Sequence, residues 1–431
     1  MVPARVAGRE EQEEQRRMSA IAEEMTARPP VRANLPAPYP SAIPRPSGAL
    51  PRAVRGVLSL EDLEPVARRY LPRFLFGFIS GGVETNAARN SNRAAFAARR
   101  LVPRMLVDTT ARRQATTLFG RPHASAFGIA PMGGAALAAF DGDLALARAA
   151  AEANIPFVLS GASLIRLEDV IAANPHAWFQ AYIPGDRVAI AALVERVGRA
   201  GYETLVVTAD VPVPANRENN VRNGWSLPLR PTPRLAYESL SHPRWLFGTA
   251  LATLRSRGMP HFENMAATRG APVLSPNAER SFGARDALNW ADIAWIRRRW
   301  PGKLVVKGLL APEDARLAQE AGCDGIIVSN HGGRQLDFSV ASLDALAGVK
   351  AEAGEMCVML DGGVRRGTDL LKALALGADF VFLGRPFLYA ASLGGKAGVR
   401  LAISLLSEEI DRDLALIGST GLDALDATFL A

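Results

Sequence analysis

The chain has 431 residues, of which 48% are hydrophobic and 22% are charged, and it carries a net charge of +7. This composition is typical of a globular protein with a large core, and the length allows one large domain or two or three average ones. Because arginine is scattered over the whole chain, the positive charge does not indicate a nucleic-acid-binding surface, and no nucleic-acid partner is expected.

The cysteine content and the apolar runs restrict the cellular location. Cys323 and Cys357 are the only cysteines, so we expect neither a disulfide framework nor a metal site, and a reducing compartment such as the cytoplasm is favoured. No uncharged apolar run is long enough to span a membrane. The first residues also lack the apolar core of a secretory signal.

The beginning of the chain differs in composition from the rest. Residues 1–55 are rich in Pro, Arg and Ala, and we predict that they form a disordered arm. Ser59, followed by Glu61 and Asp62, then predicts the start of an N-terminal helical segment. Residues 56–431 are predicted to form one catalytic domain.

From about residue 127, short apolar runs alternate with amphipathic helical stretches. This alternation predicts an α/β fold with a parallel sheet that is covered by helices. Eight runs are present, the number that a closed (β/α)8 TIM barrel requires. They occupy residues 128–131, 156–159, 178–182, 205–210, 304–307, 325–328, 357–360 and 380–383. A doubly wound open sheet is the alternative, but no Gly-x-Gly-x-x-Gly dinucleotide turn is present.

The regular spacing breaks once, after the fourth run. A proline-containing insertion at about residues 214–290 is too long for a plain loop in a compact domain. Its middle part, from Pro243 to Arg257, is basic and partly amphipathic. We expect a packed lid or a subunit contact there, and contact with a membrane surface is the alternative.

Polar side chains follow several of the runs, where a barrel builds its active site. Lys307 ends the fifth run, and burying its charge is costly unless it meets an anion or an electron-rich ring. His331 follows the sixth run, and Arg334 lies three residues further on, where it can bind a carboxylate. A base beside an anion-binding arginine suits removal of a proton from a hydroxy acid. Asp210, at the end of the fourth run, can hold the resulting imidazolium.

Glycine-rich clusters follow the last two runs. The first is Asp361-Gly362-Gly363 with Arg365, and the second is Gly384-Arg385. Glycine-rich turns bring backbone N–H groups close to an anion, and the arginines add charge-assisted hydrogen bonds. The two clusters therefore predict a phosphate site.

The segment Ser329–Asp337 reads Ser-Asn-His-Gly-Gly-Arg-Gln-Leu-Asp. It resembles the signature of the FMN-dependent L-2-hydroxy acid oxidases and dehydrogenases, which include glycolate oxidase, L-lactate dehydrogenase and mandelate dehydrogenase. The resemblance extends from roughly Leu58 to the C-terminus through the blocks Ile129-Ala130-Pro131, Phe179-Gln180-x-Tyr182, Thr208-x-Asp210, Val306-Lys307-Gly308 and residues 361–367. It implies FMN as cofactor, a small 2-hydroxy acid as substrate, a quinone, electron carrier or oxygen as acceptor, and a homotetramer.

The resemblance also implies roles for single residues. His331 takes a proton from the substrate while two electrons pass to flavin N5, as a hydride or through a carbanion, and Asp210 pairs with His331. Arg334 and Arg217 bind the substrate carboxylate, Tyr182 contacts the substrate oxygen, and Lys307 stabilises the negative charge of the reduced flavin. The isoalloxazine ring is held by Ala130, Pro131, Met132, Ser160, Gln180 and Thr208. The ribityl phosphate is held by Asp361, Gly362, Gly363, Arg365, Gly384 and Arg385.

Two positions depart from the family pattern. Phe78 stands in the substrate site where the family has a carboxylate-binding Tyr, and the missing hydroxyl removes a hydrogen bond worth about 0.5–1.5 kcal/mol. Ala162 replaces a Trp near the flavin, which makes room for a lactate-type or a bulkier aromatic substrate. The insertion resembles that of bacterial lactate and mandelate dehydrogenases, which favours a dehydrogenase that passes electrons to a quinone or a carrier protein.

The sequence therefore favours FMN-dependent oxidation of a lactate- or mandelate-like L-2-hydroxy acid to the 2-oxo acid. One alternative is an FMN barrel that acts on a hydroxy or amino substrate without a carboxylate, which Phe78 suggests but Arg217 and Arg334 disfavour. A non-catalytic flavin-binding protein is an alternative of another class, and it would not need His331 and Lys307 together. A cytoplasmic location is expected, with peripheral contact at the inner face of the membrane as a further possibility.

Overall fold

A computed structural model describes residues 39–277 and 285–431 of the chain. The chain divides into two units, Met1–Pro40 and Ser41–Ala431, and every helix and strand described belongs to the second. Most of the predicted disordered arm, residues 1–38, lies outside the described residues.

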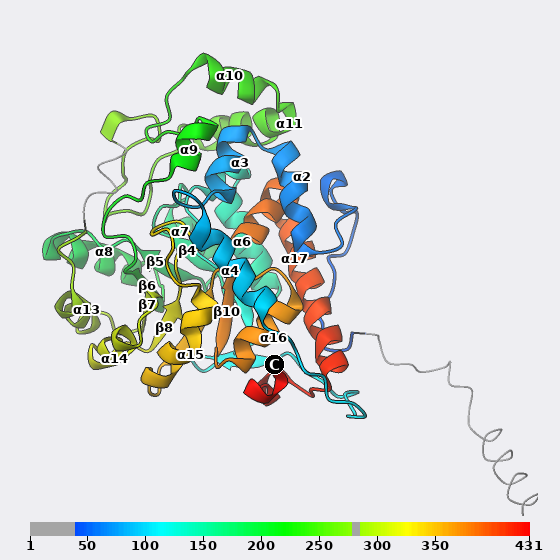
Figure 1. Ribbon diagram of the computed structural model, residues 1–431. Coiled ribbons are helices and arrows are strands. Elements are labelled where there is room, and N and C mark those ends of the chain that lie inside the picture. Colours follow the sequence, from blue (N-terminus) through cyan, green and yellow to red (C-terminus); the bar gives the residue numbers. More distant parts are fainter. Residues whose placement is uncertain (1–38, 278–284) are drawn as a thin grey trace, which may run out of the picture. The chain divides into compact units, whose positions relative to one another are not determined.

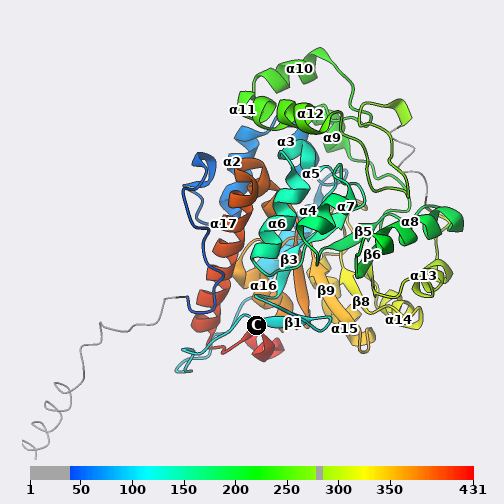
Figure 2. The ribbon, with the colours of Figure 1, turned by 180° about the vertical axis from the view of Figure 1, so that it is seen from behind.

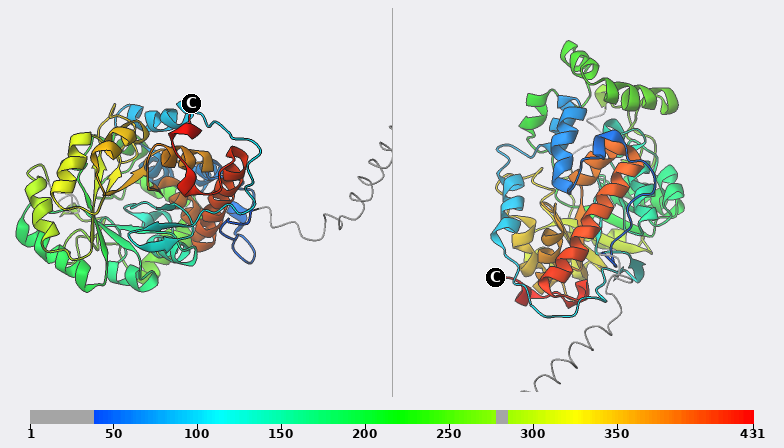
Figure 3. Two further views of the ribbon diagram at one scale, coloured as in Figure 1. Left: turned by 90° about the horizontal axis from the view of Figure 1, so that it is seen from below. Right: turned by 90° about the vertical axis from the view of Figure 1, so that its right-hand side faces the viewer.

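Eight parallel strands form a barrel, as the alternation of apolar runs predicts (Figure 1). The strand order is β3-β10-β9-β8-β7-β6-β5-β4, and a parallel bridge between Ile129 and Phe157 brings the two outer strands together. Figure 3 shows the strands arranged in a ring inside the helices. The strands are β3 Phe127–Ile129, β4 Val158–Ser160, β5 Trp178–Ala181, β6 Thr204–Thr208, β7 Lys303–Leu309, β8 Gly325–Val328, β9 Cys357–Asp361 and β10 Phe380–Leu383. Each overlaps one predicted run, so the prediction of a TIM barrel is confirmed.

Helices connect successive strands and cover the outside of the barrel (Figures 1 and 2). They are α5 Ala135–Ala138 and α6 Gly142–Glu152, α7 Leu167–Ala173, α8 Arg187–Arg199, α13 Trp290–Arg297, α14 Pro312–Glu320, α15 Ser342–Glu352, α16 Gly367–Ala375 and α17 Arg385–Ile417. The strands are almost wholly buried, because side chains fill the barrel inside and the helices pack outside.

Further elements close the two ends of the barrel. The hairpin of β1 Thr116–Leu118 and β2 Arg121–His123 lies at the end opposite the insertion (Figure 2). Before it come the helices α2 Leu63–Tyr70, α3 Arg73–Ser80 and α4 Ala87–Ala98, with short 3-10 turns at Arg52–Val54 and Leu60–Asp62. Two more 3-10 turns, Leu422–Ala424 and Ala427–Phe429, end the chain.

The prediction of a disordered arm is wrong for residues 41–55, which pack against α17. The backbone N–H of Ser41 donates to Asp411 Oδ1 at 3.1 Å, and that of Ile43 donates to Ser407 Oγ at 2.8 Å. Val54 is fully buried. This segment cannot form a core of its own, but α17 supplies both an apolar surface and polar partners for its backbone. Local composition alone does not reveal such a partner.

The insertion forms a layer over the carboxyl ends of the strands (Figures 1 and 2). It contains α9 Glu218–Asn223, α10 Pro233–Leu240, α11 Pro243–Trp245, a π-helical stretch Leu246–Leu251 and α12 Ala252–Arg257. The insertion is fixed to the barrel at two points: Asn264 Nδ2 donates to Ile165 O at 2.7 Å, and Trp245 Nε1 of α11 donates to Leu137 O at 2.8 Å. In the described part of the chain, no helix is both long and apolar enough to cross a membrane.

Candidate active site

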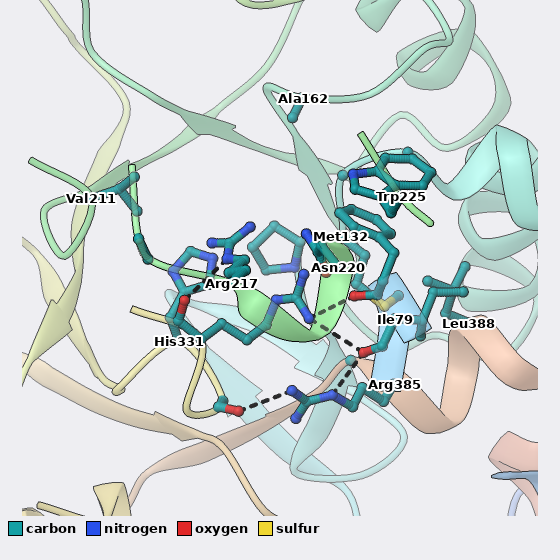
Figure 4. Close-up of a pocket in the computed structure, with 18 of the residues that line it drawn as sticks. Ile79, Met132, Ala162, Val211, Arg217, Asn220, Trp225, His331, Arg385 and Leu388 are labelled. Atoms are coloured by element: carbon teal, nitrogen blue, oxygen red, sulfur yellow. Dashed lines mark hydrogen bonds between the residues drawn. The ribbon is translucent and has the colours of Figure 1, made fainter. Parts of the chain in front are cut away.

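A cavity of about 1170 Å³ lies at the carboxyl ends of the barrel strands, below the insertion (Figure 4). Nearly all the predicted site residues line it: Phe78, Ala130, Pro131, Met132, Gln180, Tyr182, Thr208, Arg217, Lys307, His331, Arg334, Asp361, Gly362, Gly363, Arg365, Gly384 and Arg385. The other two lie directly behind this lining. Ser160 Oγ donates to Gln180 Oε1 at 3.0 Å, and Asp210 hydrogen-bonds with His331. The fold thus brings together the whole predicted set.

His331 and Asp210 form a close, largely buried pair. His331 Nδ1 lies 2.9 Å from Asp210 Oδ1, which leaves Nε2 as the second nitrogen of the ring. The backbone of His331 is left-handed, with φ 57°, a conformation that costs about 1–3 kcal/mol for a residue other than glycine. Gly333 follows with φ 72°, and a Cβ there would lie 2.3 Å from the backbone nitrogen of Arg89. The tight turn after β8 therefore holds the imidazole at the cavity.

The protonation states of this pair suit a base. Burial lowers the pKa of His331 below its ordinary 6.5, although the Asp210 carboxylate opposes the shift. Burial alone would raise the pKa of Asp210, but His331 and Lys307 outweigh it and hold that pKa below its ordinary value. At neutral pH the pair is therefore a neutral imidazole beside a carboxylate, and the imidazole is ready to accept a proton.

Lys307 is a buried cation with two fixed partners. Its Nζ donates to Ser329 Oγ at 2.9 Å and lies 3.1 Å from Asp361 Oδ2. Burial would lower the pKa of Lys307, but Asp361 and Asp210 outweigh it and raise that pKa. The side chain therefore stays charged although it is only 3% exposed. The sequence predicts Asp361 as a cofactor-binding residue, but it does not indicate this contact of Asp361 with Lys307.

The cavity strongly favours anions. Among the described residues that line it, Asp361 is the one carboxylate, against eight cationic side chains: Arg217, Arg230, Arg234, Arg285, Lys307, Arg334, Arg365 and Arg385. Burial and the neighbouring Arg217 and Arg385 hold the pKa of Arg334 well below its ordinary value. Burial also lowers the pKa of Arg385 to about 10. Such a concentration of positive charge is stabilised when anions bind.

Arg334 also joins the cavity to α3. Its Nη1 donates to Phe78 O and to Gly81 O, both at 2.8 Å, so the hydrogen-bonding capacity of this nitrogen is taken up within the protein. No described residue accepts a hydrogen bond from Nη2 or Nε of Arg334. Arg217, which precedes α9, donates through Nε to Arg334 O at 3.1 Å. Arg217 and Arg334 therefore lie at one end of the cavity. Figure 4 shows that Arg217 lies beside His331.

The other end of the cavity has the features of the predicted phosphate site. Gly362 and Gly363 have φ of 102° and 91°, and a Cβ on Gly363 would lie 2.7 Å from Asn92 O. Helix α17 begins at Arg385 immediately after Gly384. The Arg365 side chain donates through Nη1 to the neighbouring Val364 O, at 2.8 Å, and its Nε and Nη2 have no partner among the described residues. A helix start, a glycine turn and arginine side chains together suit a phosphate group.

Comparison with known proteins gives the same result as the site. A model of the FMN-dependent dehydrogenase family matches residues 67–431. The chain belongs to this family. An L-lactate oxidase from Nostoc sp. is 40% identical over 88% of this chain and 99% of its own length. An (S)-mandelate dehydrogenase from Pseudomonas putida is 37% identical over 87% and 94%, respectively.

Solved structures agree with the sequence relatives. The monotopic membrane protein (S)-mandelate dehydrogenase has a TM-score of 0.82 and 36% identity, and the match covers 88% of this chain and 100% of that one. A mandelate oxidase with benzoyl-formic acid has a TM-score of 0.70 and 35% identity, covering 87% and 98%. The chain is therefore a member of the group of FMN-linked 2-hydroxy acid dehydrogenases and oxidases.

The residues of the cavity fit FMN, the cofactor of the family. Gln180 Nε2 is buried at the cavity and has no hydrogen-bond partner among the described residues, as expected if the polar edge of a flavin ring meets it. Thr208 and Lys307 offer further polar atoms on the adjacent strands. At the opposite end, the two glycines and Arg365 would hold the phosphate.

The sequence assigns no role to three residues of the site. Gln335 hydrogen-bonds with the Arg217 side chain and donates to Asp210 O at 3.0 Å, so it links the His331–Asp210 pair to the end of the cavity that holds Arg217. Ser329 positions Lys307. Ser329 and Gln335 both lie in the signature segment Ser329–Asp337, so the resemblance of that segment to the family pattern could have identified them. Trp225 lines the cavity from the insertion, and no motif pointed to it.

Proposed function

We propose that this protein oxidises an L-2-hydroxy acid with a lactate- or mandelate-like side chain to the 2-oxo acid. The observation that carries the proposal is the His331–Asp210 pair beside Arg217 and Arg334 in one cavity. A proton acceptor next to guanidinium groups suits a substrate with a carboxylate adjacent to the carbon that is oxidised. The lactate- and mandelate-oxidising names of its relatives support the same substrate class.

The side chains of the protein divide the work of this reaction. The substrate loses two electrons and two protons; FMN, when bound, would supply the oxidising chemistry by taking the two electrons and one proton, and the protein takes the other proton. His331 Nε2 takes one proton, from the hydroxyl group or from C2 of the substrate, and Asp210 stabilises the imidazolium through Nδ1. Lys307 supplies a permanent positive charge for the negative charge that develops in the cavity.

The carboxylate and the reacting oxygen are held by different groups. Arg217 and the remaining nitrogens of Arg334 bind the carboxylate. Tyr182 contacts the substrate oxygen, and because burial and the nearby Asp210 raise the pKa of Tyr182, its hydroxyl stays protonated and donates a hydrogen bond. Arg285 lies against the Tyr182 ring, with Cζ 5.5 Å from the ring centroid, and limits its movement.

The decisive experiment is anaerobic reduction of the purified holoprotein. We expect L-lactate or L-mandelate, but not their D-enantiomers, to bleach the flavin absorbance. A holoprotein that no 2-hydroxy acid bleaches would refute the proposal. Bleaching by a hydroxy amide or an amine alone would support the substrate without a carboxylate. A protein that never becomes reduced by any of these would be the non-catalytic flavin binder.

We propose a quinone or an electron carrier as the physiological acceptor. The long insertion, which is like that of dehydrogenases, motivates this choice, and the family includes oxidases as well. Admission of air to the reduced protein tests it. Slow return of the flavin colour, together with fast return on addition of a soluble quinone, is expected for a dehydrogenase. If the flavin colour returns in air alone as fast as the enzyme turns over, the protein is an oxidase.

We propose that the insertion also contacts an anionic lipid surface, as a peripheral attachment at the inner face of the membrane. Tyr237, Leu240 and Phe247 of α10 and the π-helical stretch are 72%, 69% and 65% exposed. The exposed Arg244 and Arg255 lie in the same segment. Apolar side chains flanked by arginine suit the interface of a charged bilayer. Co-sedimentation with anionic vesicles should be lost in the Leu240→Ser, Phe247→Ser double variant, whereas equal binding by both proteins would refute the contact.

The homotetramer remains a prediction. Sedimentation velocity of the holoprotein, in detergent and in its absence, measures the assembly directly. A species of four chains is expected, and a monomer at micromolar concentration would show the prediction to be wrong.

A further inference from the structure

Part of the cavity wall is apolar rather than cationic. Six side chains that form it are Leu137, Ala162, Trp225, Leu229, Phe262 and Val273. Figure 4 shows Trp225 across the cavity from His331, with Ala162 above the space between them. The small Ala162 leaves this space open. The wall therefore faces any substituent that extends from the reacting carbon away from the base.

Trp225 and Phe78 form one stacked aromatic surface on this wall. Their ring centroids are 4.2 Å apart and the planes are inclined by 20°. The Phe78 ring also lies against the guanidinium group of Arg334, because Arg334 Cζ is 5.2 Å from the centroid of the Phe78 ring. The carboxylate-binding end and the aromatic surface thus meet at a single side chain, Phe78.

One short helix positions both recognition elements. Arg217 precedes α9 and Trp225 follows it, so the same six-residue helix fixes the guanidinium group and the indole. Gly224 ends the helix with φ 84°, and the backbone N–H of Trp225 donates to Asn220 O at 2.9 Å. Helix α3, which carries Phe78, lies so close to α9 that a Cβ on Gly77 would be 2.6 Å from the Asn223 side chain. The stacking of Phe78 on Trp225 follows from this contact.

We propose that Trp225 and Phe78 receive the side chain of the substrate, so that the enzyme prefers L-2-hydroxy acids with an aromatic ring on C2 or one carbon further over L-lactate. The proposal deepens the proposed function and rests on it. A ring stacks on the aromatic surface and removes apolar area from water, whereas the methyl group of lactate leaves most of the wall uncovered. Because Phe78 touches both ends, the ring must be joined to the carboxylate-bearing carbon by a short connection.

The experiment compares flavin reduction by L-lactate, L-mandelate and L-3-phenyllactate in the anaerobic holoprotein. The wild type should reduce with a higher ratio of kred to Kd on the better aromatic acid than on lactate, by about 10- to 200-fold, the range for one added group in a hydrophobic pocket. Trp225→Ala should lose at least about tenfold of that preference, with a smaller effect on lactate. Trp225→Phe keeps a ring and should retain most of it. Trp295→Ala, which removes a tryptophan of α13 outside the cavity lining, is the matched control and should match the wild type.

A binding measurement separates recognition of the side chain from the chemical step. Calorimetric titration of the holoprotein should show tighter binding of 2-oxo-2-phenylacetate than of pyruvate, and Trp225→Ala should remove the difference. If Trp225→Ala does not fold, Ala162→Leu narrows the same space and should weaken the aromatic ligand more than pyruvate. Preference for lactate in the wild type, or a preference for aromatic acids that Trp225→Ala leaves intact, would overturn the inference while the proposed function stands. Failure of every 2-hydroxy acid to reduce the flavin would overturn both.

Discussion

The two ends of the cavity both suit anions but are built differently. The phosphate end consists of Gly362, Gly363 and Arg365 after β9 and of the start of α17 at Arg385, whose guanidinium group reaches toward the other end and donates to Gly81 O, as Arg334 does. These residues lie within two adjacent loops of the barrel. The substrate end draws on elements that are distant in sequence: Phe78 from α3, Arg217 and Trp225 on either side of α9, and His331 after β8.

From this difference we predict which part of the enzyme tolerates little change and which part determines substrate specificity. The phosphate end rests on backbone geometry and on a helix start, which tolerate little change. The substrate end depends on the packing of α3 against α9, since Phe78 stacks on Trp225 and Arg334 donates to Phe78 O. We therefore expect changes at the phosphate end to alter cofactor affinity, and changes at the substrate end to alter rate and substrate preference.

The largest effect is expected at the substrate end. His331→Ala removes the base, and flavin reduction should slow by about 10²- to 10⁴-fold, the usual contribution of general base catalysis. Bound FMN should be unchanged, because the phosphate end is intact. Anaerobic stopped-flow spectroscopy and the flavin-to-protein ratio measure the two quantities. His242→Gln, in the insertion and outside the cavity lining, is the control. A rate for His331→Ala close to wild type would refute the assignment of the base.

The phosphate end should show the converse behaviour. Arg365→Met removes a guanidinium group that has no carboxylate partner among the described residues. Loss of a hydrogen bond to a charged group costs about 1.5–3 kcal/mol, so FMN should bind about 10- to 150-fold more weakly. Fluorescence titration of the apoprotein with FMN measures this loss. The reduction rate at saturating FMN should change little.

The adjacent Arg366 provides a matched control for Arg365. Its guanidinium group pairs with Glu409 at 2.9 Å and does not line the cavity. FMN affinity should therefore survive in Arg366→Met. Equal losses of affinity in both variants would show that general positive charge, rather than the placement of Arg365, holds the phosphate.

The comparison of the two ends also explains what the sequence could predict. The eight strands and the phosphate end follow from local patterns, since each strand is one apolar run and each glycine cluster is one contiguous motif. His331, Asp210 and Lys307 were found because the carboxyl ends of parallel strands converge at one side of a barrel. The order of residues 41–55 and the position of Trp225 were not found. Both depend on packing between segments that are far apart in the chain, for which the local sequence carries no signal.

The pH dependence of reduction tests the electrostatics at the substrate end. The base form of His331 is required, and burial lowers the pKa of His331 below 6.5. Activity should therefore be constant near neutral pH and fall about tenfold per pH unit below that pKa, as for loss of a single base. Because Asp210 raises the pKa of His331, Asp210→Asn should move the bend to lower pH. Stopped-flow pH jumps from a common neutral stock measure the profile, and a bend above 6.5 would contradict a buried neutral base.

The smallest effect concerns the residue where the carboxylate site meets the aromatic surface. Phe78→Tyr adds a hydroxyl group, and one hydrogen bond to the substrate carboxylate should tighten binding of L-lactate by about 2- to 10-fold, corresponding to about 0.5–1.5 kcal/mol. Aromatic acids should gain less, because the added hydroxyl brings a polar group to an apolar surface.

The matched control is Phe76→Tyr on the same helix, whose ring stacks on Tyr389 with centroids 6.0 Å apart and does not line the cavity. It should leave every Kd unchanged. If Phe78→Tyr improves binding of no 2-hydroxy acid, the substrate carboxylate does not reach Phe78, and a substrate without a carboxylate gains support. A gain for lactate with a smaller gain for mandelate would place the carboxylate and the ring of the substrate against this one side chain, as its contact with Arg334 and its stack on Trp225 predict.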